Sequence, residues 1–318
     1  MKNEKQIKVS VVCPYYNEES IIGGAVRHMM ESLARLPYEW ELIVVNDGSI
    51  DRGPEIVSGM SSGLAHLASI GYGVNRGRGF ALKTGIEAAT GDIIVTTEID
   101  CSWGDDIVGR LAEKLISDPM TDFVIASPNL PGGGYRNIPL KRVWTSKIGN
   151  RVLRAFFTNN ITMNTGMTRA YRRNVIQGLG FDEKGKEFHL EVLLKLLALG
   201  YRAAEVPAIL EWKDKKFAKP GSPVRKSSSR TGKLIGSHLI FAVFANPIRY
   251  FWALSLLCAL GGLGGEAYAA VRMAKGEVAI YMALVGLLLL LFSLLFFGFG
   301  VVTSQNRYIM KELWKKRR

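Results

Sequence analysis

The chain has 318 residues, a formal net charge of +13 at pH 7 and a hydrophobic content of 48%, so it exceeds one soluble domain and leaves room for a further segment. Basic proteins can bind nucleic acid, but here the excess Lys and Arg residues gather beside apolar segments near the C-terminus. That distribution argues against a nucleic-acid-binding protein and favours anionic lipid headgroups as the partner.

Two long apolar runs near the C-terminus, residues 250–271 and 278–302, predict membrane-spanning helices. Each exceeds the ~20 residues that cross a bilayer, and only residues 272–277 separate them, so we expect a two-helix transmembrane hairpin. Lys and Arg residues precede the first run, at 225–233, and follow the second, at 311–318. The positive-inside rule therefore predicts a multi-pass protein of the cell membrane, with both termini and the N-terminal domain in the cytoplasm.

The segment before the hairpin, residues 212–247, is basic and broken by prolines, and it includes a short apolar run at 234–244. That run cannot span a bilayer, so we expect an amphipathic helix in the membrane interface. The predicted domains are residues 1–211, 212–247 and 248–318. The apolar run at 9–13 is too short for a signal peptide, and the three cysteines, Cys13, Cys101 and Cys258, are expected as free thiols in a reducing compartment.

Short β-branched runs alternate with segments of helical spacing in the N-terminal two-thirds of the chain. This alternation predicts an α/β domain with an open, mostly parallel sheet and helices on both faces. Strands are expected at 7–13, 41–45, 64–70, 92–97, 122–126 and 201–210, and helices at 18–36, 78–89, 106–116 and 188–199. Residues 140–157 are amphipathic and basic, and residues 164–173 are expected to form a strand edge that runs into a helix. Residues 131–134, Pro-Gly-Gly-Gly, are expected to form a loop, either a mobile lid or a plain connector.

Two carboxylates, Glu98 and Asp100, follow the expected strand at 92–97. Ligands of open α/β sheets bind beyond the carboxyl ends of the strands, and side chains two apart on a strand point the same way. Mg²⁺ takes one or two carboxylates and lets substrate phosphates complete its coordination shell. The pair therefore suits a metal and a phosphate, although an ordinary charged strand end is the alternative.

For other motifs the sequence does not decide between a functional and a structural role. Asn-Asp-Gly-Ser-Ile-Asp at 46–51 could bind a ligand or could be a turn followed by a helix cap. Gly-Tyr-Gly at 71–73 lacks the third glycine of a dinucleotide-binding fingerprint, because Arg76 stands at that position. Glu187 and Glu191 share one helix face and are candidates for a general base or for solvated surface residues.

Six segments occur in an order that resembles a known family. They are Pro-Tyr-Tyr-Asn-Glu at 14–18, Val-Asn-Asp-Gly-Ser-Ile-Asp at 45–51, Arg-Gly-Phe-Ala-Leu-Lys-Thr-Gly at 78–85, Glu-Ile-Asp at 98–100, Thr-Gly-Met-Thr-Arg-Ala-Tyr-Arg-Arg at 165–173 and Glu-Val-Pro at 205–207. Together they resemble family 2 glycosyltransferases of the GT-A fold, most closely the branch that moves a sugar onto polyprenyl or dolichyl phosphate, as in dolichol-phosphate mannose synthases. Glu98 replaces the usual first aspartate, Thr168 adds one residue before Arg169, and Thr162 stands where the branch often has aspartate.

The resemblance implies roles for individual residues. The catalytic set would be Asp100, Glu98 and Arg169, with the metal, Mg²⁺ or Mn²⁺, held by Asp100 and Ser102. The nucleotide sugar, of the UDP-glucose or GDP-mannose class, would contact Pro14, Tyr16, Glu18, Asp47, Arg78, Lys83 and Glu98. The acceptor phosphate would meet Lys213, Arg225 and Lys226.

The reaction implied by the resemblance is one inverting displacement at the anomeric carbon of the sugar. A lipid phosphate is already anionic at pH 7, so this nucleophile needs no strong base. The alternatives are a membrane glycosyltransferase with a different lipid or glycan acceptor and a non-catalytic membrane partner that binds nucleotide. Glycines at 261–265 could pack the first span against the second, line a groove for a prenyl tail, or pack two chains as a homo-oligomer.

Overall fold

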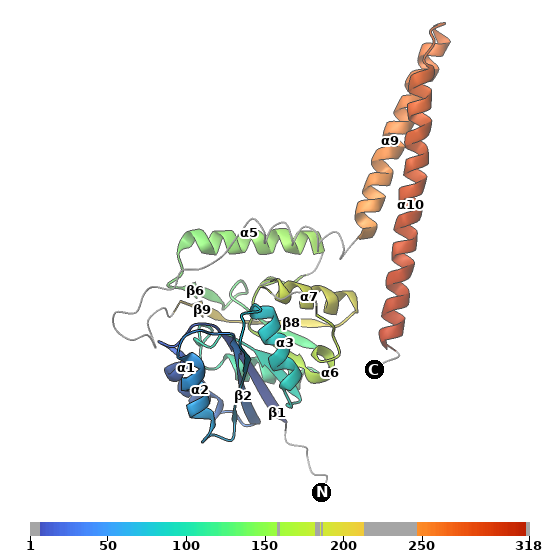
Figure 1. Ribbon diagram of the computed structural model, residues 1–318. Coiled ribbons are helices and arrows are strands. Elements are labelled where there is room, and N and C mark those ends of the chain that lie inside the picture. The colour runs from blue at the N-terminus through green and yellow to red at the C-terminus, as the bar shows by residue number, and fades with distance from the viewer. Residues whose placement is uncertain (1–6, 158–159, 182–184, 186, 213–246, 316–318) are drawn as a thin grey trace. The chain divides into compact units, whose positions relative to one another are not determined.

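The computed structural model describes residues 7–157, 160–181, 185, 187–212 and 247–315 (Figure 1). Contacts divide the chain into two units, Met1–His238 and Leu239–Arg318, and each is considered by itself. The expected interfacial helix at 234–244 lies outside the described residues.

The first unit is built on a seven-stranded sheet with the order β3-β2-β1-β4-β7-β5-β8. Only β7 runs antiparallel to its neighbours, so the sheet is mostly parallel, as predicted. The six parallel strands therefore end at one edge of the sheet. The strands are β1 (Lys8–Tyr15), β2 (Glu39–Asp47), β3 (Leu67–Tyr72), β4 (Ile93–Thr96), β5 (Phe123–Ser127), β7 (Arg169–Arg172) and β8 (Ala203–Pro207).

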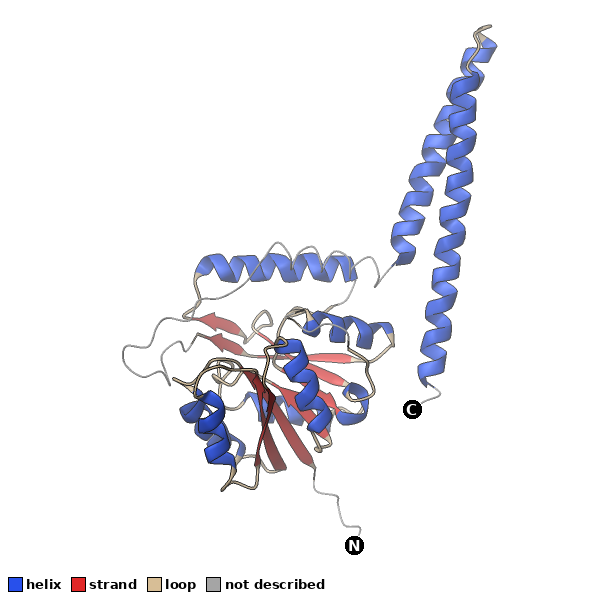
Figure 2. Ribbon diagram, viewed as in Figure 1, coloured by secondary structure: helices blue, strands red, loops and turns tan. Residues whose placement is uncertain are grey.

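Helices cover both faces of the sheet, which explains why its central strands are continuous apolar runs (Figure 2). Helices α1 (Ile22–Leu33), α2 (Gly53–Ser61) and α4 (Ile107–Ser117) form one group, and α3 (Arg78–Ala88) and α7 (Phe188–Ala198) form the other. The short helix α6 (Arg173–Ile176) follows β7. Helix α3 packs closely on β1 and β2, because a Cβ at Gly85 would lie 2.4 Å from Val12 Cγ1.

The structure corrects one expected strand. Residues 201–210 form two strands, because the chain changes partner after Pro207: Ala208 N–H donates to Ser127 O, and Gly134 N–H donates to Ala208 O. Strand β9 (Ile209–Glu211) then pairs with β6 (Gly134–Arg136) in a separate two-stranded sheet. The glycine-rich segment expected to be a loop therefore ends in a strand, which leads into helix α5 (Leu140–Phe157).

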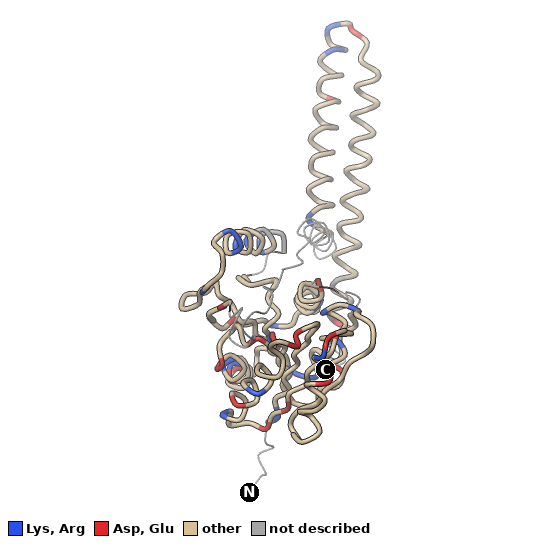
Figure 3. The backbone as a smooth tube through the Cα atoms, turned by 60° about the vertical axis from the view of Figure 1, so that its left-hand side comes forward, with Lys and Arg blue, Asp and Glu red and all other residues tan. Residues whose placement is uncertain are grey.

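The second unit consists of two helices, α9 (Pro247–Ala274) and α10 (Ile280–Lys315). Residues 247–274 and 280–306 are long and apolar enough to cross a membrane. The helices pack on each other through glycines, because a Cβ at Gly262 would lie 2.9 Å from Gly286 O. The middle parts of both helices carry almost no charge apart from Glu266, and at the connecting turn Arg272 pairs with Glu277 (Figure 3). Gly261, Gly262 and Gly265 thus serve packing within one chain, whereas a Cβ at Gly264 would meet nothing within 4 Å.

Candidate functional site

The loop after β4 brings two carboxylates and a hydroxyl together. The Ser102 hydroxyl lies 2.5 Å from Asp100 Oδ1 and 3.1 Å from Glu98 Oε2, and Ser102 N–H also donates to Asp100 Oδ1. Cys101, between them, has φ +53°, a left-handed conformation that is uncommon for residues other than glycine. The three predicted residues therefore share one tight turn at the carboxyl edge of the sheet.

Opposite charges are incompletely balanced in this turn. Burial, and then the negative charge of Asp100, raise the pKa of Glu98, whereas Arg78 lowers it. The Arg78 guanidinium lies 3.8 Å from Glu98 Oε1, and Trp103 Nε1–H donates to Glu98 Oε2 at 3.2 Å. Two carboxylates that share one nearby guanidinium favour an additional cation, so this donor set fits a divalent metal completed by substrate phosphates.

The small sheet is attached to the same loop. Glu211 N–H donates to Ser102 O at 2.8 Å, and Trp212 N–H donates to Arg136 O at 3.1 Å. The Arg142 guanidinium lies 4.6 Å from the centre of the Trp212 ring. Strand β9 and the first turn of α5 are therefore tied to the carboxylate loop.

The loops after β1 and β2 are joined by reciprocal hydrogen bonds. Asn17 N–H donates to Ser49 Oγ, and Ile50 N–H donates to Asn17 Oδ1. Asn17 has φ +52°, which turns the chain so that Tyr16 stays exposed while Glu18 is buried. Together with Pro14 at the end of β1, these predicted contacts lie at the carboxyl edge that also carries Glu98.

Asp47 holds the loop that leads into α3. Its carboxylate is 4% exposed and accepts hydrogen bonds from the Tyr72 hydroxyl, Asn75 Nδ2 and the backbone N–H groups of Arg76 and Gly77. In this structure Asp47 therefore bonds to the protein itself and positions Arg78. Spacing along the sequence gave no sign of these bonds.

Lys83, also expected to contact the nucleotide sugar, lies five residues after Arg78 on α3. Its Nζ is 3.9 Å from Glu87 Oε1, and its side chain is partly exposed.

Arg169, predicted to contact a phosphate, is inaccessible in this structure. Its side chain is 0% exposed and donates to Asn164 O and His189 O, both at 2.7 Å. The cause is topological, since β7 is inserted between β4 and β5 and is covered on both faces. Arg169 thus holds β7 against α7 and has no surface for a phosphate.

The two candidate bases also differ from expectation. Glu191 is 3% exposed and lies 2.5 Å from Lys195 Nζ, so it is a buried ion-pair partner and neither alternative holds. Glu187 stands immediately before α7.

The predicted acceptor contacts Lys213, Arg225 and Lys226 lie outside the described residues. The three cysteines are free, as expected.

Sequence reasoning assigned no role to Glu205, which organises the segment around Thr162. Its carboxylate accepts hydrogen bonds from Thr162 N–H, the Thr162 hydroxyl and Met163 N–H. The Thr162 hydroxyl also lies 2.6 Å from Ser127 Oγ, at the end of β5. This network fixes the chain beneath α5.

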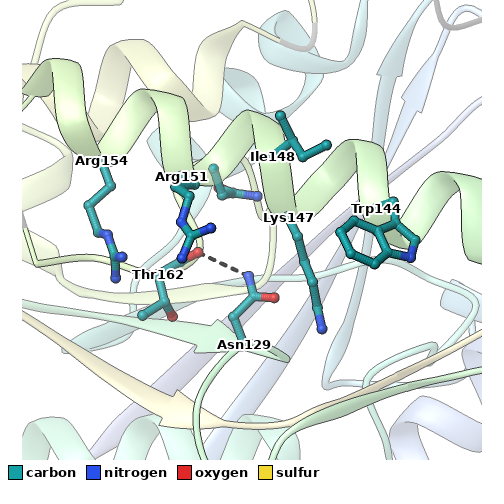
Figure 4. Close-up of a pocket in the computed structure, with 8 residues that line it drawn as sticks. Asn129, Trp144, Lys147, Ile148, Arg151, Arg154 and Thr162 are labelled. Atoms are coloured by element: carbon teal, nitrogen blue, oxygen red, sulfur yellow. Dashed lines mark hydrogen bonds between the residues drawn. The ribbon is translucent and has the colours of Figure 1, made fainter.

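A cavity of about 320 Å³ lies between α5 and this segment (Figure 4). Three cations of α5 point toward it, four and three residues apart along the helix. The lining residues are Asn129, Trp144, Lys147, Ile148, Asn150, Arg151, Arg154 and Thr162. The sequence showed that residues 140–157 are basic and amphipathic, but it could not show that these cations face a cavity.

Comparisons with known proteins agree with this architecture. The crystal structure of glucosyl-3-phosphoglycerate synthase from Mycobacterium tuberculosis in complex with Mn²⁺, UDP and phosphoglyceric acid is 21% identical, with a TM-score of 0.51, and the match covers 75% of this chain and 77% of that one. The structure of that synthase with Mg²⁺ and UDP is also 21% identical, with a TM-score of 0.50 over 75% and 78% of the two chains.

These similarities establish the fold. The family itself follows from a sequence match, because residues 10–180, more than half of the chain, match the model of glycosyl transferase family 2. The matched region contains the carboxylate loop, the two joined loops and Arg78. The chain therefore belongs to glycosyltransferase family 2.

Proposed function

We propose that the protein transfers a sugar from a nucleotide-diphosphate sugar to a polyprenyl phosphate, undecaprenyl or dolichyl, at the cytoplasmic face of the membrane. One observation carries the proposal: Glu98, Asp100 and Arg78 converge at the carboxyl edge of a family 2 domain whose chain continues into two helices of membrane-spanning length. The two carboxylates and Arg78 would bind a diphosphate donor, and the two helices would bring the domain close to a lipid acceptor.

The donor would lie over the joined loops and the carboxylate turn. Pro14, Tyr16 and Glu18 would surround the nucleoside, while Asp47 would set the position of Arg78. Asp100 and Ser102 would hold Mg²⁺ or Mn²⁺, which supplies positive charge beside the departing diphosphate. The neighbouring synthase is solved with either ion and with UDP, and this supports the assignment.

The chemistry is a single displacement. A phosphate oxygen of the lipid attacks the anomeric carbon, the bond from that carbon to the diphosphate oxygen breaks, and the nucleoside diphosphate leaves with the electron pair. Backside attack inverts the anomeric configuration. The nucleophile is an anion at neutral pH, so the burial of Glu191 does not obstruct the reaction.

The hairpin would hold the active domain where such an acceptor presents its phosphate. The basic residues on both sides of the hairpin support a cytoplasmic domain and cytoplasmic termini, as the positive-inside rule would predict. A free soluble acceptor would need no such anchor.

A transfer assay tests the acceptor. The full-length protein in detergent is incubated with Mn²⁺, radiolabelled UDP-glucose or GDP-mannose, and one of three acceptors: polyprenyl phosphate, diacylglycerol or 3-phosphoglycerate. We expect label in the organic phase with polyprenyl phosphate and one of the donors. Label in diacylglycerol or in phosphoglycerate alone would overturn the acceptor, and nucleotide binding without any transfer would favour a non-catalytic role.

A further inference from the structure

The cavity beneath α5 has a chemistry distinct from that of the carboxylate turn. Three of its eight lining side chains are cations, Lys147, Arg151 and Arg154, and none is a carboxylate (Figure 4). We infer that this cavity binds the phosphate group of the lipid acceptor, with the first part of the lipid chain on its apolar rim. The inference rests on the proposed function and names the acceptor subsite.

Three cations gather on one side of α5, where the Nζ of Lys147 lies 5.8 Å from the centre of the Tyr135 ring. They lie at intervals of four and three residues, so they occupy neighbouring positions on one side of α5. Within residues 7–157, 160–181 and 187–212, none of them forms an ion pair. Like charges at this spacing repel, and a bound dianion would remove the repulsion while accepting charge-assisted hydrogen bonds.

Apolar side chains line the same cavity and remain exposed. Trp144 is 66% exposed and Ile148 is 56% exposed, and Leu140, one turn earlier, is 76% exposed. Free phosphate would use the cations and leave this rim in water. An amphiphile with a phosphate head and an apolar chain would use both, which is why the inference commits to a lipid phosphate.

The cavity lies at the edge of the sheet that also holds the carboxylate turn. Asn129 follows β5, and its amide donates to Thr162 O, while Glu98 follows β4, two places away in the strand order. The backbone bond from Glu211 to Ser102 and the contact of Arg142 with Trp212 connect the start of α5 to the turn. Donor and acceptor subsites would thus be neighbours along one edge.

The first test measures acceptor saturation by the full-length protein. In the double variant Lys147→Gln/Arg151→Gln we expect the KM for polyprenyl phosphate to rise about tenfold or more, with the KM for the nucleotide sugar unchanged, because two charge-assisted contacts are lost. Lys141→Gln is the matched control, since Lys141 is an exposed cation of the same helix that does not line the cavity. An unchanged acceptor KM in the double variant would overturn the inference.

The second test separates a lipid phosphate from free phosphate and needs no turnover. Binding of polyprenyl phosphate to the full-length protein in detergent is measured without donor, in the presence and absence of inorganic phosphate. We expect Trp144→Ser to weaken lipid binding and inorganic phosphate to compete poorly. Equal competition by inorganic phosphate, with no effect of Trp144→Ser, would show a general anion site and overturn the lipid assignment.

The two failures can be distinguished. If the wild-type protein forms no glycolipid from any donor, the proposed function fails. If it forms glycolipid while the double variant keeps the wild-type acceptor KM and lipid binding, only the acceptor subsite is wrong.

Discussion

At the scale of single residues, the carboxylate turn combines charges that would be unfavourable without a ligand. Glu98 and Asp100 share one hydroxyl, and Arg78 is the cation nearest to Glu98. Family membership gives these side chains a diphosphate as their expected ligand. Under the proposed function, Arg78 would contact the donor phosphates as well as Glu98.

Replacing Arg78 tests that role. We expect Arg78→Ala to lower kcat/KM for sugar transfer by about 10- to 100-fold, because a cation beside the departing diphosphate is lost. Lys83→Ala, on the same helix, should have a smaller effect, since Lys83 lies beside Glu87. Steady-state transfer with varied nucleotide sugar measures both variants, and equal losses would contradict a specific role of Arg78.

At the scale of elements, the loops at the carboxyl edge hold each other in place. Asp47 orders residues 75–77, and this loop packs so closely on Gly48 that a Cβ there would lie 2.3 Å from Asn75 N. Gly48 also has φ +66°, which favours glycine. The loops after β2 and β3 therefore keep this conformation because residue 48 is a glycine.

We expect Gly48→Ala to destabilise the protein by about 2–4 kcal/mol and to weaken nucleotide binding, because the added methyl group meets backbone atoms in a strained conformation. Gly59→Ala is the control, since a Cβ at this helical position meets nothing within 4 Å and should stabilise slightly. Urea unfolding of the full chain in detergent, followed by tryptophan fluorescence, gives the free energies. Equal stability of both variants would refute the close contact at Gly48.

The opposite edge of the sheet contains a charged network. Burial raises the pKa of Glu41, but hydrogen bonds from Lys8, Ser10 and Thr90 outweigh it and lower the pKa to about 2. Because the folded-state pKa lies below the ordinary value of 4.5, the network stabilises the fold above pH 4.5, and this contribution is lost as the pH falls toward 2.

Glu41→Gln should therefore cost about 1–2 kcal/mol of stability at pH 7, after allowance for solvent screening, and this difference should shrink below pH 4. Urea unfolding of the wild type and of Glu41→Gln at several pH values measures the difference in their free energies of unfolding. A difference that stays constant from pH 7 to pH 3 would exclude the ionised carboxylate as its source.

Much of this element-level arrangement could be predicted from the sequence. The alternation of apolar runs and helical spacing predicted the mostly parallel sheet, and the carboxylates after 92–97 predicted a charged pair at its carboxyl edge. The pair was expected to be aligned by strand alternation, but β4 ends at Thr96 and a turn brings Glu98 and Asp100 together. The antiparallel insertion of β7 could not be predicted, because pairing with β4 and β5 depends on contacts distant in sequence. That insertion buries Arg169, whereas the family resemblance implied that Arg169 contacts a phosphate.

At the scale of the whole molecule, a family 2 domain is joined to two helices that are long and apolar enough to cross a membrane. The apolar runs predicted both helices, since length and hydropathy are the features that identify a candidate membrane span. The cavity under α5 could not be predicted, because the helix is basic in sequence whether or not its cations face a partner. Under the proposed function, the two helices would bring the family 2 domain to its lipid acceptor.

The most direct measurement of the central claim compares the wild-type protein with Asp100→Asn in transfer of radiolabelled sugar to polyprenyl phosphate. We predict label in the lipid phase for the wild type with Mn²⁺ or Mg²⁺, and its loss with a chelator and in Asp100→Asn, because one carboxylate of the turn is removed. Transfer by Asp100→Asn at the wild-type rate, or transfer that persists with a chelator, would contradict the account.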